Sequence, residues 1–315
     1  MGLVIGMDEA GYGPNLGPLV VTVTAWEVPG DPRRFDFWSA FADVVDQSPP
    51  ETNARLHVAD SKQVYSTARG IGRLEQSVLC AFRLGPTPPG SFRELWHSLV
   101  DQAENDPDHE PWLRDRDLPL PYSEQAPPTA LLSRKWQTRC KKHGIRLQAI
   151  RSDIVLTERF NQLTAACGSK GMTLSRISLQ LLRRVWDPDD PQPTLIIADK
   201  HGGRNRYDGF LDEIVDGKMI FRQREHASQS SYRVGNTEIR FEPRAEAHFP
   251  VAMASMVSKY VRELAMVLFN DFWCERIPGL RPTKGYYTDA CRFREQIAAT
   301  QAELGIEDVM LWRER

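Results

Sequence analysis

The chain has 315 residues, of which 41% are hydrophobic and 26% are charged. This composition excludes global disorder, and the length allows one large domain with a substantial core. Lys and Arg number 40 against 42 Asp and Glu, which gives a formal net charge of −2. No overall positive charge is available, so a nucleic acid would have to be held by a local basic surface.

The sequence predicts a protein of the reducing cytoplasm. The first residues, MGLVIGMDEAGYG, lack the basic and apolar regions of a signal peptide, and no run approaches the 18 apolar residues of a membrane span. The five cysteines are odd in number and show no CxxC spacing, which argues against a disulfide framework or a zinc site. We therefore expect no membrane association. A monomer is a separate expectation, which these observations do not establish.

The first 28 residues predict a strand, a loop and a second strand. The apolar run Leu3–Met7 ends at two acids, Asp8 and Glu9, and is followed by the Gly- and Pro-rich segment AGYGPNLGP. The next segment, LVVTVTAWEV (19–28), is rich in β-branched residues, as strands are. Residues 68–83 then have helical spacing.

Residues 84–128 differ in composition from the rest of the chain, since nine of the 22 prolines fall there. We interpret them as an irregular insertion with a short helix at FRELWHSLVDQA (92–103), and Trp96 and Trp112 suggest that parts of it pack on the body. The segment 156–186 predicts helices, interrupted at GSKG. The basic segment 133–146 is interpreted as a solvated helix face, with a nucleic-acid contact as the alternative.

The last third predicts two more strands that end on acids, followed by a long helix. TLIIAD (194–199) is a short apolar run ending at Asp199, and EIRFEPRAE (238–246) is predicted to be extended and to end at Glu246. A helix over 252–273 begins with small residues that allow close packing. Strands ending on acids and interleaved with helices indicate an α/β fold.

These carboxylates are candidates for a metal site. Neighbouring strands lie about 4.8 Å apart, so acids at their ends can share two divalent ions roughly 3.5–4 Å apart. A set of oxygen ligands favours Mg²⁺ or Mn²⁺ over zinc. For any one acid alone, a helix cap or a solvated strand end is the commoner role. Glu242 competes with Glu246 for the fourth place, and proximity to the strand end favours Glu246.

Five motifs, in order, resemble the bacterial ribonuclease HII and HIII families. They are MDEAGYGPNLGPLVV (7–21), HVADSKQVYS (57–66), LIIADK (195–200), RAEAHFPVAMASMVSKYVRE (244–263) and RPTKGYYT (281–288). Arg-Ala-Glu is closer to the Lys-Ala-Glu of HIII than to the Lys-Gly-Asp of HII. Residues 84–150 match little.

The resemblance implies a ribonuclease H-like fold, which is a mixed five-stranded sheet flanked by helices. It implies one catalytic domain over residues 1–315, with a helical part from about residue 252 that grips the duplex. The implied activity is hydrolysis of RNA in RNA/DNA hybrids or at a ribonucleotide embedded in DNA, leaving 5′-phosphate and 3′-hydroxyl ends. Asp8, Glu9, Asp199 and Glu246 match the family acids that bind two Mg²⁺ or Mn²⁺ ions.

The same resemblance implies a set of substrate contacts. Gly11, Tyr12 and Gly13 match the loop whose backbone meets the 2′-hydroxyl, a group that distinguishes RNA from DNA. Tyr12 stands where HII enzymes carry arginine, and this difference predicts a preference for long hybrids over a single ribonucleotide. The alternative for this segment is an ordinary turn.

Further along the chain, Ser61 and Lys62 match phosphate contacts, as do Lys284 and, on the helix after Glu246, Lys259. Tyr286 matches a tyrosine that packs on the sugar at the cleavage position. Each also has a plainer interpretation, as a solvated loop or a half-buried side chain.

The sequence thus predicts a divalent-metal-dependent endoribonuclease that acts on RNA/DNA hybrids or ribonucleotide-containing duplexes. Two alternatives remain open. One is a nuclease of the same fold with another nucleic-acid substrate, and the other is a non-catalytic module that binds hybrids.

Overall fold

The computed structural model describes residues 1–315 except 51, 53, 101–105, 125–127 and 315. The strands are β1 (Gly2–Ala10), β2 (Leu19–Val28), β3 (Val45–Asp46), β4 (Leu56–His57), β5 (Arg146–Val155), β6 (Thr194–Asp199), β7 (Phe221–His226), β8 (Gln229–Val234) and β9 (Thr237–Glu242). The longer helices are α3 (Gly72–Phe82), α4 (Phe92–Leu99), α5 (Ala130–His143), α6 (Thr157–Cys167), α7 (Lys170–Arg183), α9 (Phe249–Cys274) and α10 (Tyr287–Glu303). Shorter helices are α1 (Phe37–Phe41), α2 (Ser61–Val64), α8 (Asp208–Asp212) and α11 (Asp308–Leu311), with 3₁₀ turns η1 (Pro32–Arg34), η3 (Pro107–His109) and η4 (Ala245–Ala247).

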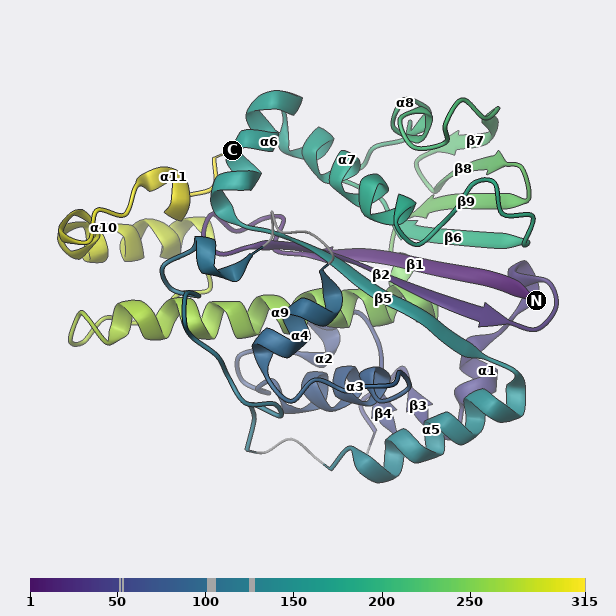
Figure 1. Cartoon of the computed structure of the whole chain (residues 1–315), viewed down its shortest axis with the longest axis horizontal. Helices are drawn as coiled ribbons and strands as arrows, with labels where there is room; N and C mark the ends of the chain where they lie inside the picture. Colours follow the sequence, from purple (N-terminus) through teal and green to yellow (C-terminus); the bar gives the residue numbers. More distant parts are fainter. Residues whose placement is uncertain (51, 53, 101–105, 125–127, 315) are drawn as a thin grey trace.

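The centre of the molecule is a seven-stranded mixed sheet in the order β5-β2-β1-β6-β9-β8-β7 (Figure 1). Strands β1, β6 and β9 run parallel, whereas β2 and β5 on one side and β8 and β7 on the other are antiparallel to their neighbours. The expected mixed sheet flanked by helices is confirmed. The expected number of five strands is too small, because the β7–β8 hairpin extends the sheet beyond β9.

Helices cover both faces of the sheet, because alternate residues of the central strands are apolar on each side. In β1, Val4 belongs to the core beneath α9, while Leu3, Ile5 and Met7 belong to the core beneath α7. Successive side chains of a strand point to opposite faces. Asp8 therefore lies on the α9 side of the sheet, and its neighbour Glu9 lies on the α7 side.

The first turn of helix α9 packs directly on β1. A Cβ atom at Gly6 would lie 2.2 Å from the carbonyl carbon of Pro250, so only glycine fits at this crossing. The hydroxyl of Thr24 on β2 donates to the Pro250 carbonyl at 2.8 Å. Further along the helix, the small residues Ala254 and Ser258 are fully buried. The expected close packing of this helix is confirmed, and it fixes the helix beneath the acids.

The insertion packs on the body as expected. Trp96 and Trp112 are both 1% exposed, and the Trp112 ring lies 5.1 Å from that of Phe269 on α9. The predicted helix at 92–103 is α4, which ends at Leu99, and residues 101–103 lie outside the described part. Residues 101–105 and 125–127 of the insertion are likewise outside it.

Other sequence predictions fare differently. The segment GSKG separates α6 from α7, and Ser169 caps α7 by accepting from the Met172 amide. In the basic segment 133–146, helix α5 buries Trp136 on Trp26, so this tryptophan cannot stack on a base. The prediction that 238–246 is extended throughout is wrong in its second half, because β9 ends at Glu242 and the chain then turns into η4.

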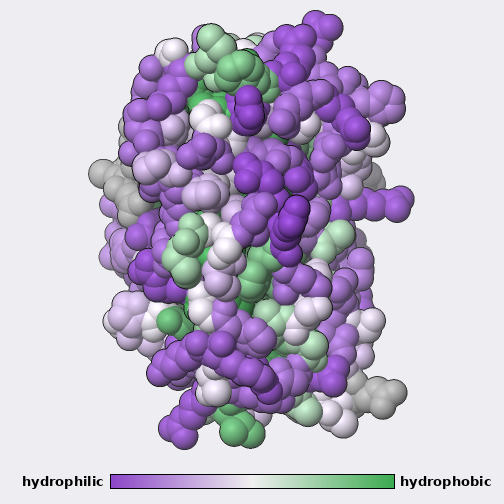
Figure 2. Space-filling view, turned by 90° about the vertical axis from the view of Figure 1, so that its right-hand side faces the viewer, coloured by the Kyte–Doolittle hydropathy of each residue, from purple (hydrophilic) through white to green (hydrophobic). Residues whose placement is uncertain are grey.

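The surface at the end of the sheet where β1 begins is mainly polar. Figure 2 shows this face, on which hydrophobic residues form small separate patches between hydrophilic ones. Within the described part of the chain, no helix is both long and apolar enough to span a membrane.

Candidate active site

Four carboxylates come from three elements at the end of the parallel strands. Asp8 and Glu9 lie near the end of β1, and Asp199 is the last residue of β6. Glu246 lies on η4, the turn that joins β9 to α9. The turn is tied to β6 by the Ala245 amide, which approaches Asp199 Oδ1 at 3.4 Å. All four candidate acids therefore lie at one edge of the sheet.

The four acids interact electrostatically, as their effects on one another's pKa values show. Burial, with repulsion from Glu9 and Glu246, raises the pKa of Asp8 well above its ordinary value. Burial also raises the pKa of Glu9 to about 7, with Asp199 and Glu246 adding to the shift. The pKa of Glu246 is raised by burial and by Asp199. A cation at this position would relieve the repulsion of ionised carboxylates.

The donor set fits a hard divalent ion in charge and in ligand type, since it consists of carboxylate oxygens. In the described residues, however, no group of three or more His, Cys, Asp or Glu side chains is arranged as an ion site. The acids are near enough to raise one another's pKa values, but their oxygens are not arranged around a common point. Binding an ion would therefore require the carboxylates to move closer together.

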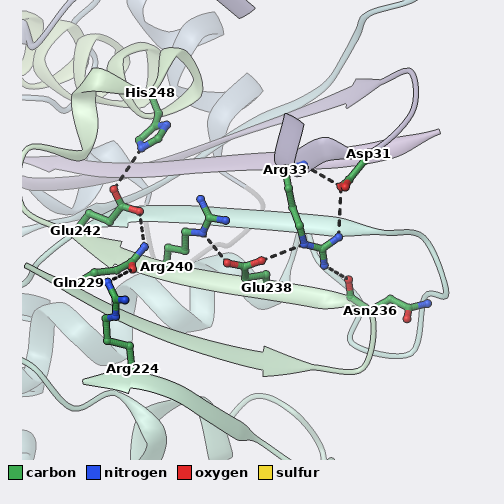
Figure 3. A network of polar contacts seen from close by, with 9 residues as sticks. All are labelled: Asp31, Arg33, Arg224, Gln229, Asn236, Glu238, Arg240, Glu242 and His248. Atoms are coloured by element: carbon green, nitrogen blue, oxygen red, sulfur yellow. Dashed lines mark hydrogen bonds and ion pairs between the residues drawn. The ribbon is translucent and has the colours of Figure 1, made fainter. Parts of the chain in front are cut away.

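Glu246, and not Glu242, belongs electrostatically to the acid group. Figure 3 shows Glu242 turned into a separate polar network on β9, where it accepts from Gln229 at 3.0 Å and pairs with His248 Nε2 at 3.3 Å. The hydrogen bond with His248 lowers the pKa of Glu242, whereas the pKa of Glu246 is raised. The preference for Glu246 stays a prediction. It is supported here by these electrostatic differences and no longer by proximity to the strand end, because β9 ends at Glu242.

Two hollows meet at Asp199. The larger, of about 700 Å³, is lined by Trp38 and Lys62 as well as by Asp199 and Glu246. The smaller, of about 260 Å³, lies between Asp199 and the turn of the β7–β8 hairpin. Burial would lower the pKa of Lys62, but Asp60, Asp8, Glu246 and Glu9 outweigh it and raise this pKa. Lys62 is thus a cation that faces the acids.

The glycine loop after β1 (residues 11–13) is closely packed around Gly11 and open around Gly13. Gly11 has φ +94°, and a Cβ there would lie 2.5 Å from the Pro18 carbonyl oxygen and 2.6 Å from Arg262 Nε. The loop conformation therefore requires glycine. Around Gly13 there is room, with only the Tyr286 ring close to where its Cβ would be, at 3.9 Å. Gly13 and the exposed Tyr286 thus lie together.

Tyr12 packs on the α7 side of the sheet. Its hydroxyl would meet a Cβ on Gly171 of α7 at 3.7 Å. Burial raises the pKa of Tyr12; Glu9 raises it further, and Arg204 opposes both. The phenol therefore occupies the space between the loop, α7 and the segment after β6.

Ser61 and Lys62 begin α2, whose first turn is capped by Asp60 Oδ1 accepting from the Lys62 amide at 3.0 Å. Ser61 is only 5% exposed and accepts from the Ser255 hydroxyl at 3.2 Å. Ser61 thus holds α2 against α9, and Lys62 is the better placed of the two for a ligand.

Lys259 and Lys284 form a second cluster around the buried Glu263. Lys259 Nζ lies 2.5 Å from Glu263 Oε1, and Lys284 Nζ lies 2.8 Å from Glu263 Oε2. The Tyr65 hydroxyl donates to the same carboxylate at 2.6 Å. The attraction and hydrogen bonds of the two lysines overcome burial and lower the Glu263 pKa to about 2. Both lysines are therefore already paired within the protein.

Two buried arginines that the sequence analysis missed support the glycine loop. Arg262 Nη2 donates to the Leu16 carbonyl at 3.0 Å, and Arg313 Nη2 donates to the Gly11 carbonyl at 2.5 Å. Burial lowers both pKa values, that of Arg313 to about 9. The sequence signal for Arg262 was its place in the motif at 244–263. Arg313 has no local signal, because its partners are some 300 residues away.

No protein-family model matches the chain, and no curated protein is significantly similar to it in sequence. Among solved structures, it is similar to ribonuclease HII of Archaeoglobus fulgidus, solved in complex with PCNA (16% identity, TM-score 0.46, 99% of this chain and 94% of that one). It is also similar to ribonuclease H2 of Pyrococcus horikoshii OT3 (15%, 0.48, 98% and 92%) and to Bst ribonuclease HIII, solved with Mn²⁺ (14%, 0.39, 99% and 66%). These similarities concern the fold alone.

Proposed function

We propose that this protein is a divalent-metal-dependent endoribonuclease that hydrolyses the RNA strand of RNA/DNA hybrids. The observation that carries the proposal is the group of four acids at one edge of the sheet, three of which have raised pKa values. A protein that only binds nucleic acid gains nothing from burying carboxylates that repel one another and the phosphate backbone. A metal-dependent hydrolase needs such carboxylates as ligands.

Each group has a distinct role in this proposal. Mg²⁺ or Mn²⁺, when bound, would lower the pKa of the attacking water and offset charge on the leaving 3′-oxygen. Asp8, Glu9, Asp199 and Glu246 would hold the ions. Lys62 faces the acids and would attract the phosphate to be cut, leaving a 5′-phosphate and a 3′-hydroxyl on the products.

The glycine loop and Tyr286 are proposed to recognise the sugar. Because Gly11 and Gly13 carry no side chains, the backbone can approach a 2′-hydroxyl closely. The exposed Tyr286 ring beside Gly13 offers a surface against which the ribose would pack. Lys259 and Lys284 are proposed to act differently from the sequence prediction, as a paired platform that fixes Tyr65 and the start of α10, with any phosphate contact secondary.

The domain organisation is part of the proposal. In this proposal residues 1–315 form one catalytic domain, the insertion at about 84–128 supports α9 through Trp112, and the helices after α9 would lie beside the hybrid. Tyr286 is the residue that precedes α10, so this helix begins at the proposed sugar contact. We propose that α10 follows the duplex and that the enzyme acts as a monomer.

A cleavage assay tests the proposal. A hybrid labelled on the RNA strand is incubated with protein in Mg²⁺, in Mn²⁺ or in EDTA, beside a DNA duplex, an RNA duplex and single-stranded RNA. We expect cleavage of the hybrid only with metal, and product ends that a 3′-hydroxyl-dependent polymerase extends. Cleavage of another substrate in preference to the hybrid would favour a different nuclease, and metal-independent binding without cleavage would favour a binding module.

A further inference from the structure

Arg244 has an unusual backbone conformation at a decisive position. It has φ 61° and ψ 41°, in the left-handed region, and it is one of three non-glycine residues with positive φ in the described part of the chain. This conformation is unfavourable for an L-residue with a long side chain and is readily adopted by glycine or asparagine. The turn it makes carries the chain from β9 into η4 and so delivers Glu246. Glycine would make the same turn, so the turn does not explain the arginine.

The arginine side chain is exposed and unpaired. Within the described residues, the Arg244 guanidinium makes no hydrogen bond, ion pair or ring contact. Other cations near the acids are engaged: Lys200 Nζ donates to Asn205 and Ser230, and the Arg204 guanidinium lies over the Phe210 ring. The unpaired guanidinium, beside a group of carboxylates, has its five donors free for a ligand.

Arg244 lines both hollows that meet at Asp199. The larger contains Lys62, Trp38 and Glu246, and the smaller is closed by Gly203 and Ala227. The Trp38 indole is fixed there, because its Nε1 donates to the Ala247 carbonyl at 2.9 Å. An extended strand that crossed Asp199 from one hollow to the other would pass Arg244 on its way.

We propose that Arg244 binds a backbone phosphate of the substrate strand, next to the phosphate positioned at the acids. The inference rests on the proposed function, and it adds a phosphate contact between Lys62 on one side and the β7–β8 turn on the other. A guanidinium binds phosphate through two parallel hydrogen bonds, which fixes the strand in register as well as attracting it. The left-handed conformation is retained at a functional residue because the side chain is needed there.

Substitutions at Arg244 separate this role from a structural one. Arg244→Gly and Arg244→Asn suit the backbone, so we expect melting temperatures equal to or above that of the wild type. Binding of a fluorescent, uncleaved hybrid in EDTA should weaken about tenfold, and the slope of log K against log salt should fall by about one, as for the loss of one phosphate contact. Arg244→Lys should keep part of the affinity. Arg34→Gln, an exposed arginine in η1 at the opposite end of the sheet, is the charge control and should bind like the wild type.

The possible results distinguish failure of the phosphate contact from failure of the proposed function. Wild-type affinity and salt slope in both Arg244→Gly and Arg244→Asn would overturn the phosphate contact, as would equal weakening in Arg34→Gln. A lower melting temperature in both variants would make Arg244 a structural residue and also overturn it. If the wild type binds but never cuts a hybrid with Mg²⁺ or Mn²⁺, the proposed function fails, and the Arg244-dependent binding still decides the contact. Absence of hybrid binding in EDTA overturns the Arg244 contact, and absence of cleavage with Mg²⁺ or Mn²⁺ as well refutes both proposals.

Discussion

The buried carboxyl of Glu110 should make the free energy of unfolding depend on pH in a specific way. This carboxylate of the insertion is 3% exposed and accepts from the Thr157 amide at 3.0 Å and from Trp112 Nε1 at 2.6 Å. Burial outweighs these hydrogen bonds and raises its pKa from 4.5 to about 7. Such a rise corresponds to about 3 kcal/mol between the two protonation states.

The sign follows from the two states of the chain. Below pH 4.5 the carboxyl is protonated whether the chain is folded or unfolded, and it adds no pH dependence. Between pH 4.5 and 7 the unfolded chain releases the proton while the folded chain keeps it, so stability falls as the pH rises. Above pH 7 the loss is complete. Glu110→Gln removes this dependence and loses about 1 kcal/mol, because its amide NH₂ cannot accept one of the two hydrogen bonds.

Urea unfolding of the wild type and Glu110→Gln between pH 4 and 8.5 measures the effect. We expect the variant to be slightly less stable at pH 4 and about 2 kcal/mol more stable at pH 8, a relative change of about 3 kcal/mol. Glu110 and the exposed Glu158 line one surface hollow, so Glu158→Gln is the control and should run parallel to the wild type. Parallel curves for Glu110→Gln would refute the reasoning, since titrating groups that do not interact with Glu110 cancel in the difference. The buried Arg313 does interact with it, but burial lowers the Arg313 pKa only to about 9, above the pH range used.

Three further predictions concern the candidate site. Asp8→Asn and Asp199→Asn should abolish cleavage and, in EDTA, unfold at the wild-type temperature or higher, because each removes a repelling charge; full activity in either variant or in EDTA would contradict the metal mechanism. With Tyr12 in the glycine loop, a long hybrid should be cut faster than a duplex with one ribonucleotide at matched salt, and the reverse order would show that Tyr12 does not set this preference. Glu246→Gln should lower the cleavage rate by orders of magnitude or shift the metal preference, while Glu242→Gln should be mild; the opposite ranking would reassign the fourth acid.

The central strands could be predicted from the sequence because their signals are local. The apolar runs that became β1, β2 and β6 are bounded by glycine, proline or acids, and the predicted bounds of 19–28 and 194–199 are those of the structure. A strand buried on both faces has a continuous apolar sequence. The apolar runs do not specify strand direction, because the equally buried β2 is antiparallel to β1 whereas β6 is parallel to it. The parallel pairing of β1 with β6 brings Asp8, Glu9 and Asp199 to the same end of the sheet.

Strands that lack a buried face carried no such signal. The edge strand β7 exposes nearly all of its side chains, and β5 begins with exposed and half-exposed residues before its buried second half. β7 shows no polar-apolar alternation, and in β5 the alternation covers only the first four residues. The end of β9 was misplaced for another reason: Pro243 has no amide to continue the ladder, and Arg244 turns the chain through the left-handed region.

Partners drawn from distant segments could not be predicted either. Lys259 and Lys284 were interpreted as phosphate contacts because a lysine in a motif carries no sign of its partner. In the folded chain Glu263 and Tyr65 occupy their amines. Only the pair Lys259 and Glu263 has a sequence signal, the i,i+4 spacing on a helix.

The glycine loop shows why a motif is not a complete description of a site. Gly11 makes room for Arg262, whose Nε would be 2.6 Å from a Cβ at this position, and Arg313 donates to the Gly11 carbonyl of the same loop. Burying two guanidinium groups is unfavourable unless their donors are used, and carbonyl oxygens of the loop accept some of them. The loop, α9 and the segment after α11 thus stabilise one another. The backbone offered to a ribose is therefore set by residues from both ends of the sequence, and the motif supplies only the glycines that let them meet.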